Sequence, residues 1–318
     1  MTHALTFARA KEHLTREEGA SVREQESGHT TVLLREALEL LAPEDTDYVI
    51  DATLGLGGHS EAILVQAKVT LLGIDADPQA IAASSSRLGL FGERVKLVEG
   101  NFRDLEKILH HEGIEKADKV LFDLGWNSTQ MQSGRGFSFR HDEPLSMSYG
   151  KSPASGFTAR EILNEWDEKV LADVLYGYGE ERYARRIAKA IIERRALKPI
   201  ETTIELAEII KDAVPALYRH GRIHPATRTF QALRIAVNDE LGSLEKGIAA
   251  AWKHLAPNGR IAVITFHSIE DRIVKKLFAG YAKEGGTLLV KKPLIADSQE
   301  ISHNPSARSA KLRGIQKI

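Results

Sequence analysis

Three glycines stand close together in the segment DATLGLGGHS (residues 51–60), between a short apolar run and a helical pattern. The spacing of Gly55, Gly57 and Gly58 differs from the dinucleotide fingerprint G-x-G-x-x-G, and the loop lacks the lysine of a phosphate-binding P-loop. Glycines allow a ligand to approach the backbone, and the N-terminus of a following helix favours a carboxylate. The loop therefore predicts a cofactor turn, with an ordinary tight strand-to-helix turn as the alternative.

Side chains of the types that bind ligands also end the neighbouring apolar segments. Asp75 ends the second segment, where a carboxylate is able to accept hydrogen bonds from both hydroxyls of a ribose. Phe102 follows the third segment and is placed to stack beside an adenine. Asp123 follows the fourth, where many S-adenosylmethionine (SAM) enzymes hold a residue between cofactor and acceptor, and Asp51 ends the first, where it is placed to face an amino group. A nicotinamide enzyme and a SAM enzyme both fit these positions.

The elements that would position these residues alternate between strand and helix. Strands are expected over 48–53, 69–77, 94–102 and 117–125, with helices over 59–67, 78–88 and 103–113. A helix is also expected over 31–42, one long helix over 226–256, a fifth strand over 259–268 and a last edge strand over 309–318. This rhythm predicts an α/β fold with a parallel, doubly wound, Rossmann-like sheet and a ligand at the C-terminal ends of its strands.

The strand-and-helix rhythm breaks after Gly125. The segment that follows, up to residue 157, is rich in Gly, Ser and Pro, which predicts an ordered functional loop, and the next patterns are all helical. We therefore expect an all-helical insertion in the sheet domain. The expected division is a polar tail over 1–27, a cofactor-binding domain over 28–139 and 226–318, and a helical substrate-recognition domain over 140–225.

The composition excludes several kinds of site. The 318-residue chain has no cysteine, so disulfides, thiolate metal sites and cysteine nucleophiles are ruled out. Histidines and carboxylates show no convincing metal spacing, so no metal is expected. No apolar run approaches the roughly 18 residues of a membrane span, and no signal peptide is visible, so we expect a cytoplasmic protein without a membrane partner. With 43 basic and 44 acidic residues, any nucleic-acid surface must be a local patch.

At this point the sequence resembles the small-subunit 16S rRNA (cytosine-N4)-methyltransferase family, from about His29 to the C-terminus. The resemblance rests on GHTTVLL, DATLGLGGHS, GIDADPQAI, FDLGWNSTQM, SGRGFSF, YGYGEERYARRIAKAI, HPATRTFQALRIAVNDEL, FHSIEDRIVK and NPSARSAKLR. It implies a methyltransferase fold interrupted by a helical domain, SAM as cofactor, and 16S rRNA or the small ribosomal subunit as partner. Whether the chain forms a homodimer is left open.

The resemblance also implies a set of functional residues. The cofactor contacts of the family fall on Gly57, Gly58, His59, Asp75, Phe102, Asp123 and Gln130. Two segments depart from the family pattern: residues 127–130 read NSTQ instead of S-S-P-Q, and residues 144–150 read PLSMSYG instead of P-L-D-M-R-M-D. These changes leave the cofactor residues intact, but they bear on how the target base is bound.

Methylation at N4 of cytosine requires an acceptor for a hydrogen of the amine, whose lone pair is delocalised into the ring, and alignment for in-line attack. Asp123, or a backbone carbonyl near it, is the candidate acceptor, with a purely cofactor-binding role as the alternative. The absence of cysteine argues against C5 methylation, which normally proceeds through a covalent cysteine adduct. A target base within folded RNA would have to be unstacked from its neighbours to reach the cofactor. The candidate RNA contacts are Arg135, His224, Arg228 and His267. A functional role is favoured for His224 and Arg228, and a structural role is the alternative for His267.

Three competing functions fit parts of the sequence. A nicotinamide dehydrogenase would use Asp75 but predicts the dinucleotide fingerprint, which is absent. A non-enzymatic RNA-binding or assembly factor predicts damage to the cofactor loop, which is intact. A methyltransferase with another acceptor fits the cofactor residues equally well, and only the resemblance in the helical segment argues against it.

Overall fold

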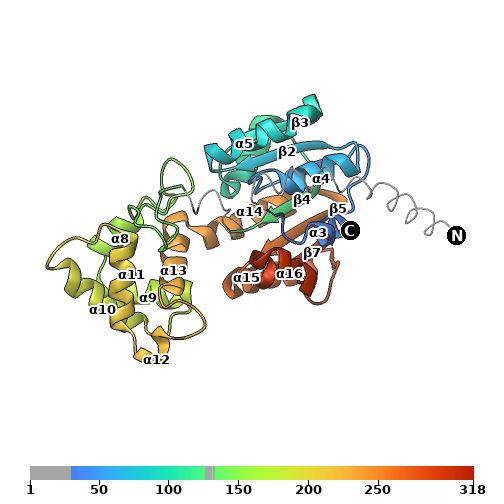
Figure 1. The fold of residues 1–318 in the computed structure, drawn as a ribbon. Coiled ribbons are helices and arrows are strands. Elements are labelled where there is room, and N and C mark those ends of the chain that lie inside the picture. Colours follow the sequence, from blue (N-terminus) through green and yellow to red (C-terminus); the bar gives the residue numbers. More distant parts are fainter. Residues whose placement is uncertain (1–29, 126–130, 132) are drawn as a thin grey trace.

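The computed structural model describes residues 30–125, 131 and 133–318, and Figure 1 shows their arrangement. Within these residues seven strands form one sheet in the order β3-β2-β1-β4-β5-β7-β6. The strands are β1 (Tyr48–Asp51), β2 (Thr70–Asp75), β3 (Val95–Glu99), β4 (Ala117–Asp123), β5 (Leu255–Thr265), β6 (Gly286–Leu288) and β7 (Lys311–Lys317). The first five pair in parallel, and β7 runs antiparallel to both of its neighbours. The predicted α/β class and its Rossmann-like sheet are confirmed.

The central strands are apolar because both faces of the sheet are covered. Successive residues of a strand point to opposite faces, so Val49 packs into one core and Ile50 into the other. The first face carries α3 (Leu34–Leu41), α4 (Gly58–Gln66) and α5 (Pro78–Leu88), and the second carries α6 (Leu105–Glu112), α14 (Glu240–His254) and α15 (Ser268–Tyr281). Short elements complete this unit: η2 (Gly89–Arg94), η3 (Phe102–Asp104), α16 (Ser298–His303) and η4 (Pro305–Ser309).

A separate group of helices lies beside the sheet (Figure 1). It consists of α8 (Ala159–Glu165), α9 (Glu168–Gly179), α10 (Ala184–Arg195), α11 (Thr203–Ala213), α12 (Ala216–Arg219) and α13 (Thr227–Asn238), and we call it the helical unit. These helices share a hydrophobic core of their own, to which α13 contributes Phe230, Leu233 and Val237. The helical core thus reaches beyond residue 225, the expected end of the inserted domain. The division into domains stays a prediction.

The prediction of one long helix over 226–256 was wrong. The chain breaks at Asp239, whose backbone is left-handed with φ 45° and ψ 45°. The break turns α13 toward the helical unit, whereas α14 packs on the sheet through Leu244 and Ile248. Asn238, just before the break, donates from its side chain to the carbonyl of Met147 at 2.8 Å and accepts from the backbone N–H of Tyr149 at 2.9 Å. The break thereby anchors the PLSMSYG segment between the two units.

The prediction of a last edge strand over 309–318 was also wrong in its placement. β7 lies between β5 and β6, and the three-residue β6 takes the edge. Leu312 and Ile315 of β7 are fully buried, each in a different core, and the backbone of β7 pairs with both β5 and β6. Among the described helices, none is both long enough and apolar enough to pass through a membrane.

Candidate functional site

A cleft of about 890 Å³ opens at the C-terminal ends of the parallel strands. One wall comes from the glycine loop and from the residues that follow β2, β3 and β4. The opposite wall comes from α13, α14, the first turn of α15 and Tyr149, and the segment from His303 to Ser309 closes one end. A smaller hollow of about 350 Å³ adjoins the cleft, with which it shares Ala76, Asn101 and Tyr149 among its lining residues. The cleft is thus built from both faces of the sheet and from the helical unit.

The glycine loop comes close to other parts of the chain. Gly57 has φ 77° and is the N-cap of α4, and no described side chain caps this helix. The amides of its first turn are therefore available to an anionic group. A Cβ at Gly58 would lie 2.1 Å from the hydroxyl oxygen of Thr31, so a larger residue would displace that segment. The loop conformation thus requires glycine at both positions.

Asp75 braces the glycine loop from the neighbouring strand. Its Oδ2 accepts from the N–H of Gly55 at 2.8 Å, and its Oδ1 accepts from the N–H of Asp77 at 2.8 Å. Burial raises the pKa of Asp75 to about 6. A carboxylate oxygen has the capacity to accept two hydrogen bonds, so the two oxygens of Asp75 can still receive two ligand hydroxyls. Phe102 lines the same wall and meets Phe122 edge to face, with ring centroids 5.6 Å apart.

Asp51 lies beneath the loop rather than in the cleft. Its carboxylate is almost fully buried and accepts from the hydroxyl of Ser60 at 2.7 Å and from the N–H of Thr53 at 3.2 Å. Burial raises the pKa of Asp51 to about 6. The sequence analysis placed Asp51 where it could face an amino group, whereas in the structure its two carboxylate oxygens accept hydrogen bonds from Thr53 and Ser60. Its role in the structure is to hold the loop.

Asp123 lies between the glycine loop and the opposite wall. Its Oδ2 is 3.5 Å from Nδ1 of the buried His59, whose Nε2 lies 3.1 Å from the carbonyl oxygen of Val32. Its Oδ1 is buried and accepts no hydrogen bond within the described part of the chain. Burial, with the nearby charges of Asp51 and Glu270, raises the pKa of Asp123 well above its usual value. An unsatisfied carboxylate oxygen in a cleft is a candidate for direct contact with a ligand.

The opposite wall carries a buried ion pair that sequence reasoning missed. Arg234 donates through Nε and an Nη to both oxygens of Glu240, at 2.8 and 2.9 Å, and the hydroxyl of Tyr149 donates to the same carboxylate at 2.9 Å. Burial raises the pKa of Tyr149 well above its usual value, so this hydroxyl keeps its proton. The signal available in the sequence was a charged pair six residues apart within an otherwise apolar helical pattern.

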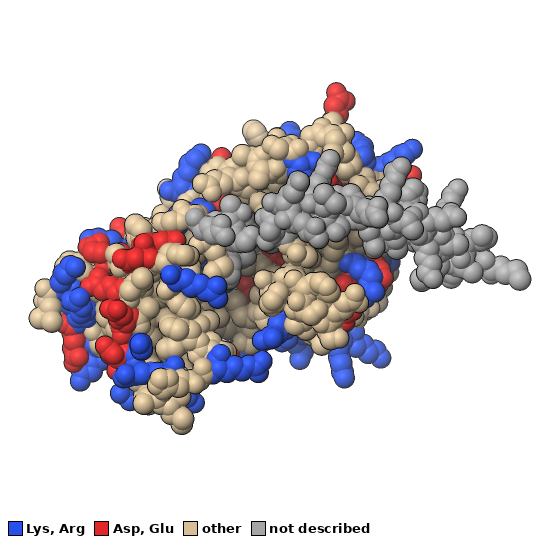
Figure 2. All heavy atoms as spheres, viewed as in Figure 1, with Lys and Arg blue, Asp and Glu red and all other residues tan. Residues whose placement is uncertain are grey.

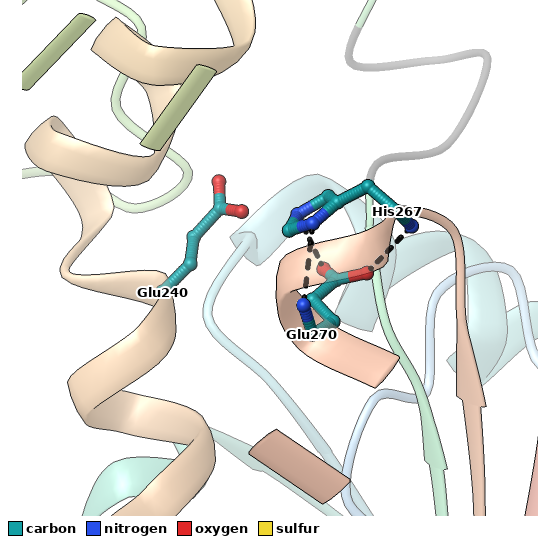
Figure 3. A group of neighbouring side chains, drawn as sticks. All are labelled: Glu240, His267 and Glu270. Carbon is teal, nitrogen blue, oxygen red and sulfur yellow. Dashed lines mark hydrogen bonds and ion pairs between the residues drawn. The ribbon is translucent and has the colours of Figure 1, made fainter. Parts of the chain in front are cut away.

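His267 faces Glu240 across a gap and forms a pair with Glu270 (Figure 3). Its Nδ1 accepts from the N–H of Glu270 at 3.3 Å, and Glu270 Oε2 accepts from the N–H groups of Phe266 at 2.9 Å and His267 at 3.2 Å. Burial acts to raise the pKa of Glu270, but the adjacent His267 and Arg234 bring it below its usual value. Ligand atoms of Glu240, His267 and Glu270 lie within 4.8 Å of one another, a spacing that could suit a cation. Because Arg234 already supplies positive charge to both oxygens of Glu240, we interpret the three as part of a polar network around the Arg234–Glu240 ion pair and not as a metal site.

The other residues expected to touch RNA lie outside the lining of the cleft. Arg135 donates to Asp77 Oδ2 at 2.5 Å and to the carbonyl of Tyr149 at 2.6 Å, so its guanidinium serves internal contacts. His224 is exposed and stacks on Phe139 at 4.4 Å between centroids. Arg228 donates to the backbone carbonyl of Glu180 at 2.9 Å. Of the four expected RNA contacts, the structure places His267 in the cleft. Gln130 and the altered NSTQ segment lie outside the described residues, as does the expected tail.

Two arginines that the sequence analysis did not single out lie at the cleft. Arg140 and Arg308 both line it and are both exposed, and neither has an ion pair or side-chain hydrogen bond among the described residues. They are far apart in the sequence: Arg140 lies in the loop before the helical unit, and Arg308 lies in η4. On the face shown in Figure 2, Lys and Arg atoms lie along the border between the helical unit and the sheet. Two exposed arginines thus lie at the lining of the cleft and are available to a negatively charged ligand.

Glu180 connects the helical unit to the wall that carries His267. It ends α9 in a left-handed conformation, and its carboxylate accepts from the hydroxyl of Ser268 and from Arg272, each at 2.7 Å. Ser268 and Arg272 belong to the first turns of α15, directly after His267. The two units are thus tied together next to the cleft.

Comparison with known proteins gives the family of the chain. A model of the MraW methylase family matches residues 26–318. The protein is 46% identical over 310 residues to the ribosomal RNA small subunit methyltransferase H of Heliobacterium modesticaldum, covering 91% of this chain and 98% of that one. It is 50% identical over 297 residues to the protein of the same name from a Synechocystis species, covering 91% and 93%.

Solved structures are similar at a lower level. A crystal structure of an rRNA methylase from Streptococcus thermophilus is 14% identical, with a TM-score of 0.41, covering 90% of this chain and 93% of that one. The curated relatives and the family model agree with the resemblance found in the motifs of the sequence. The match spans the glycine loop, the helical unit and the C-terminal segment that closes the cleft, so the chain belongs to the MraW methylase family.

Proposed function

We propose that the protein transfers a methyl group from SAM to the exocyclic N4 of a cytidine in the 16S rRNA of the small ribosomal subunit. The family and the names of the relatives support methylation of small-subunit ribosomal RNA. The choice of cytosine N4 rests on Asp123, because its unsatisfied Oδ1 offers a hydrogen-bond acceptor where a methyl acceptor would have to enter.

The residues of the first wall suit SAM. The uncapped N-terminus of α4 would receive the carboxylate of the methionine part, and Asp75 would receive the two ribose hydroxyls. Phe102 and the hollow beside Ala76 would hold the adenine. When bound, SAM supplies a methyl group activated on a positively charged sulfur. A nicotinamide dehydrogenase is inconsistent with the methylase family, and the intact glycine loop argues against a non-enzymatic RNA-binding factor.

Asp123 would do the chemistry that the amine needs. The nitrogen gains the methyl group and releases one proton, and a hydrogen bond from the amine to Oδ1 would localise its lone pair before transfer. Burial raises the pKa of Asp123, which makes its carboxylate a better proton acceptor than an exposed aspartate. Most of the rate would come from alignment of the amine with the methyl group inside the cleft.

The helical unit and the two exposed arginines at the cleft would hold the RNA. A base within folded RNA must be unstacked to enter a cleft, and arginines at the rim would hold the phosphates on either side. Arg140 and Arg308 are placed for this task because their guanidinium groups are exposed and have no partner among the described residues.

The test is transfer of labelled methyl groups from SAM to small ribosomal subunits from a strain that lacks this activity, followed by nucleoside analysis. We expect a labelled N4-methylcytidine peak that is lost in Asp75→Ala and in Asp123→Ala. SAM binding is measured on each variant, because Asp123→Ala should retain more of it than Asp75→Ala. Label in another nucleoside would contradict the choice of N4, and the absence of transfer by wild-type protein that binds SAM would contradict the enzymatic function.

A further inference from the structure

Two buried polar atoms in the cleft lack hydrogen-bond partners within the described residues. They are Oδ1 of Asp123 and Nε2 of His267, and the other unsatisfied buried side-chain atoms lie away from the cleft. A buried polar group without a partner is costly, so such groups in a cleft indicate where a ligand makes hydrogen bonds. The chemistry of these two atoms is therefore informative about the ligand.

The two atoms differ in hydrogen-bonding type. The carboxylate oxygen of Asp123 is an acceptor. In His267, Nδ1 already accepts from the N–H of Glu270 at 3.3 Å, which places the ring proton of the neutral imidazole on Nε2. Nε2 lies 3.2 Å from Glu270 Oε1, but without the geometry of a hydrogen bond. His267 thus presents an N–H donor at Nε2, because the backbone N–H of Glu270 in the first turn of α15 occupies Nδ1.

The acceptor and the donor stand at the ends of neighbouring parallel strands. Asp123 pairs in register with Ile264 of β5, and the N–H of Leu124 donates to the carbonyl of Ile264 at 3.0 Å. His267 follows Ile264 by three residues, and both side chains line the same cleft. An acceptor and a donor that line one cleft, at the ends of adjacent strands, correspond to the Watson–Crick edge of cytosine, which presents the N4 amine as donor and N3 as acceptor.

We propose that His267 Nε2 donates a hydrogen bond to N3 of the target cytosine while Asp123 Oδ1 accepts one from its N4 amine, so that the two residues select cytosine over uracil. This inference rests on the proposed function and adds a specificity residue to it. Uracil presents an acceptor at O4 and a donor at N3, so it would set oxygen against Asp123 and N–H against His267. Both mismatches would leave buried groups unpaired.

Two variants of His267 separate base recognition from helix capping. Asparagine caps helices well, so His267→Asn should keep the hydrogen bond to the N–H of Glu270 while losing the donor at the Nε2 position. In His267→Gln the longer side chain carries an amide N–H near the Nε2 position but caps poorly. Thermal melting and SAM binding are measured on both variants to establish that each is folded and holds its cofactor.

A matching change in the RNA substrate removes the N3 acceptor of the target cytosine. Small subunits are reconstituted with 16S rRNA that carries 3-deazacytidine at the methylated position, which replaces N3 by a C–H group and keeps the N4 amine. With wild-type protein we expect kcat/KM to fall about 10- to 100-fold relative to cytidine, the effect of leaving one buried donor unpaired. With cytidine, His267→Asn should show a similar loss, and His267→Gln a smaller one.

The decisive measurement is the combination of both changes. If His267 contacts N3, then His267→Asn acting on 3-deazacytidine should be no slower than either single change. Losses that multiply, or full activity of His267→Asn on cytidine, would overturn the inference and leave N4 methylation standing. A wild-type protein that forms no N4-methylcytidine on the natural subunit would overturn the proposed function and this inference together.

Discussion

Arg135 and Asp77 form an ion pair of 2.5 Å that ties the SGRGF segment to the turn carrying Asp75. Asp77 is also the N-cap of α5, and its N–H donates to Asp75 Oδ1. Through the carbonyls of Ser148 and Tyr149, the same guanidinium holds the PLSMSYG segment. One arginine thereby connects the loop before the helical unit to the cofactor side of the cleft.

Removal of this arginine should cost stability as well as cofactor affinity. Arg135→Ala leaves Asp77, with 3% of its side chain exposed, without a countercharge. We expect the free energy of unfolding to fall by roughly 2–4 kcal/mol in urea titrations, together with weaker SAM binding in calorimetry. The control is Arg140→Ala, five residues along the chain, whose side chain has no partner among the described residues. It should change stability by less than about 0.5 kcal/mol, and equal losses in the two variants would contradict the structural role of Arg135.

Asp75 should make SAM binding dependent on pH. Burial raises the pKa of Asp75 to about 6, so the carboxylate that we propose accepts the ribose hydroxyls becomes protonated as the pH falls below 6. We expect the Kd for SAM to rise between pH 7.5 and pH 5 in the wild type. Asp75→Asn should raise the Kd about 10- to 100-fold at pH 7.5, because hydrogen bonds to a charged group are lost. Its Kd should vary less with pH than that of the wild type, and an equally steep dependence in Asp75→Asn would assign the titration to another group.

Asp51 should make folding less favourable as the pH rises. Its pKa is about 6 in the folded protein against a reference value of 3.8, so its contribution to stability is fully present below the unfolded pKa and is lost as the pH passes through 6. The difference corresponds to roughly 3 kcal/mol. Asp51→Asn should therefore gain stability relative to the wild type between pH 4.5 and pH 7.5, as measured by urea unfolding at each pH. A difference that does not change with pH would contradict the raised pKa.

Arg140 and Arg308 should carry part of the affinity for RNA. Each phosphate contact that is removed lowers the dependence of log K on log salt by about one unit. We expect Arg140→Ala and Arg308→Ala each to weaken binding to small subunits and to reduce this slope, with SAM binding unchanged. Lys68→Ala is the matched control, because this exposed lysine precedes the N-terminal end of β2, whereas the cleft opens at the C-terminal ends of the strands. If all three variants behave alike, the rim of the cleft has no special role.

The sequence predicted the first wall of the cleft better than the second. Asp75 and Asp123 end their strands and Phe102 follows β3, and the C-terminal ends of parallel strands lie together, so a local pattern was enough to group the three residues. Tyr149, Arg234 and Glu240 come from a loop and two helices that meet only through tertiary packing. No periodicity within one segment could place them together.

The break at Asp239 and the position of β7 were not predicted, because both depend on features that a local sequence pattern does not show. The helical spacing of apolar residues continues on both sides of Asp239. The turn is made by a left-handed non-glycine residue, so neither a glycine nor a proline marks it in the sequence. The interior position of β7 depends on β6, which has only three residues, too few for an alternating strand pattern to be recognised in the sequence. The internal role of Arg135 could not be predicted, because its partners lie 58 residues before it and 14 residues after it in the sequence.

The bonds of Glu180 give the helical unit a mechanical connection to α15. Its carboxylate holds Ser268 and Arg272, so a rigid displacement of the helical unit must either break both hydrogen bonds or pull on the first turns of that helix. His267 is the residue that precedes this turn. Under the proposed function, an RNA that displaces the helical unit would therefore also move the imidazole of His267, and a substrate that fails to engage the helices would leave that imidazole out of position.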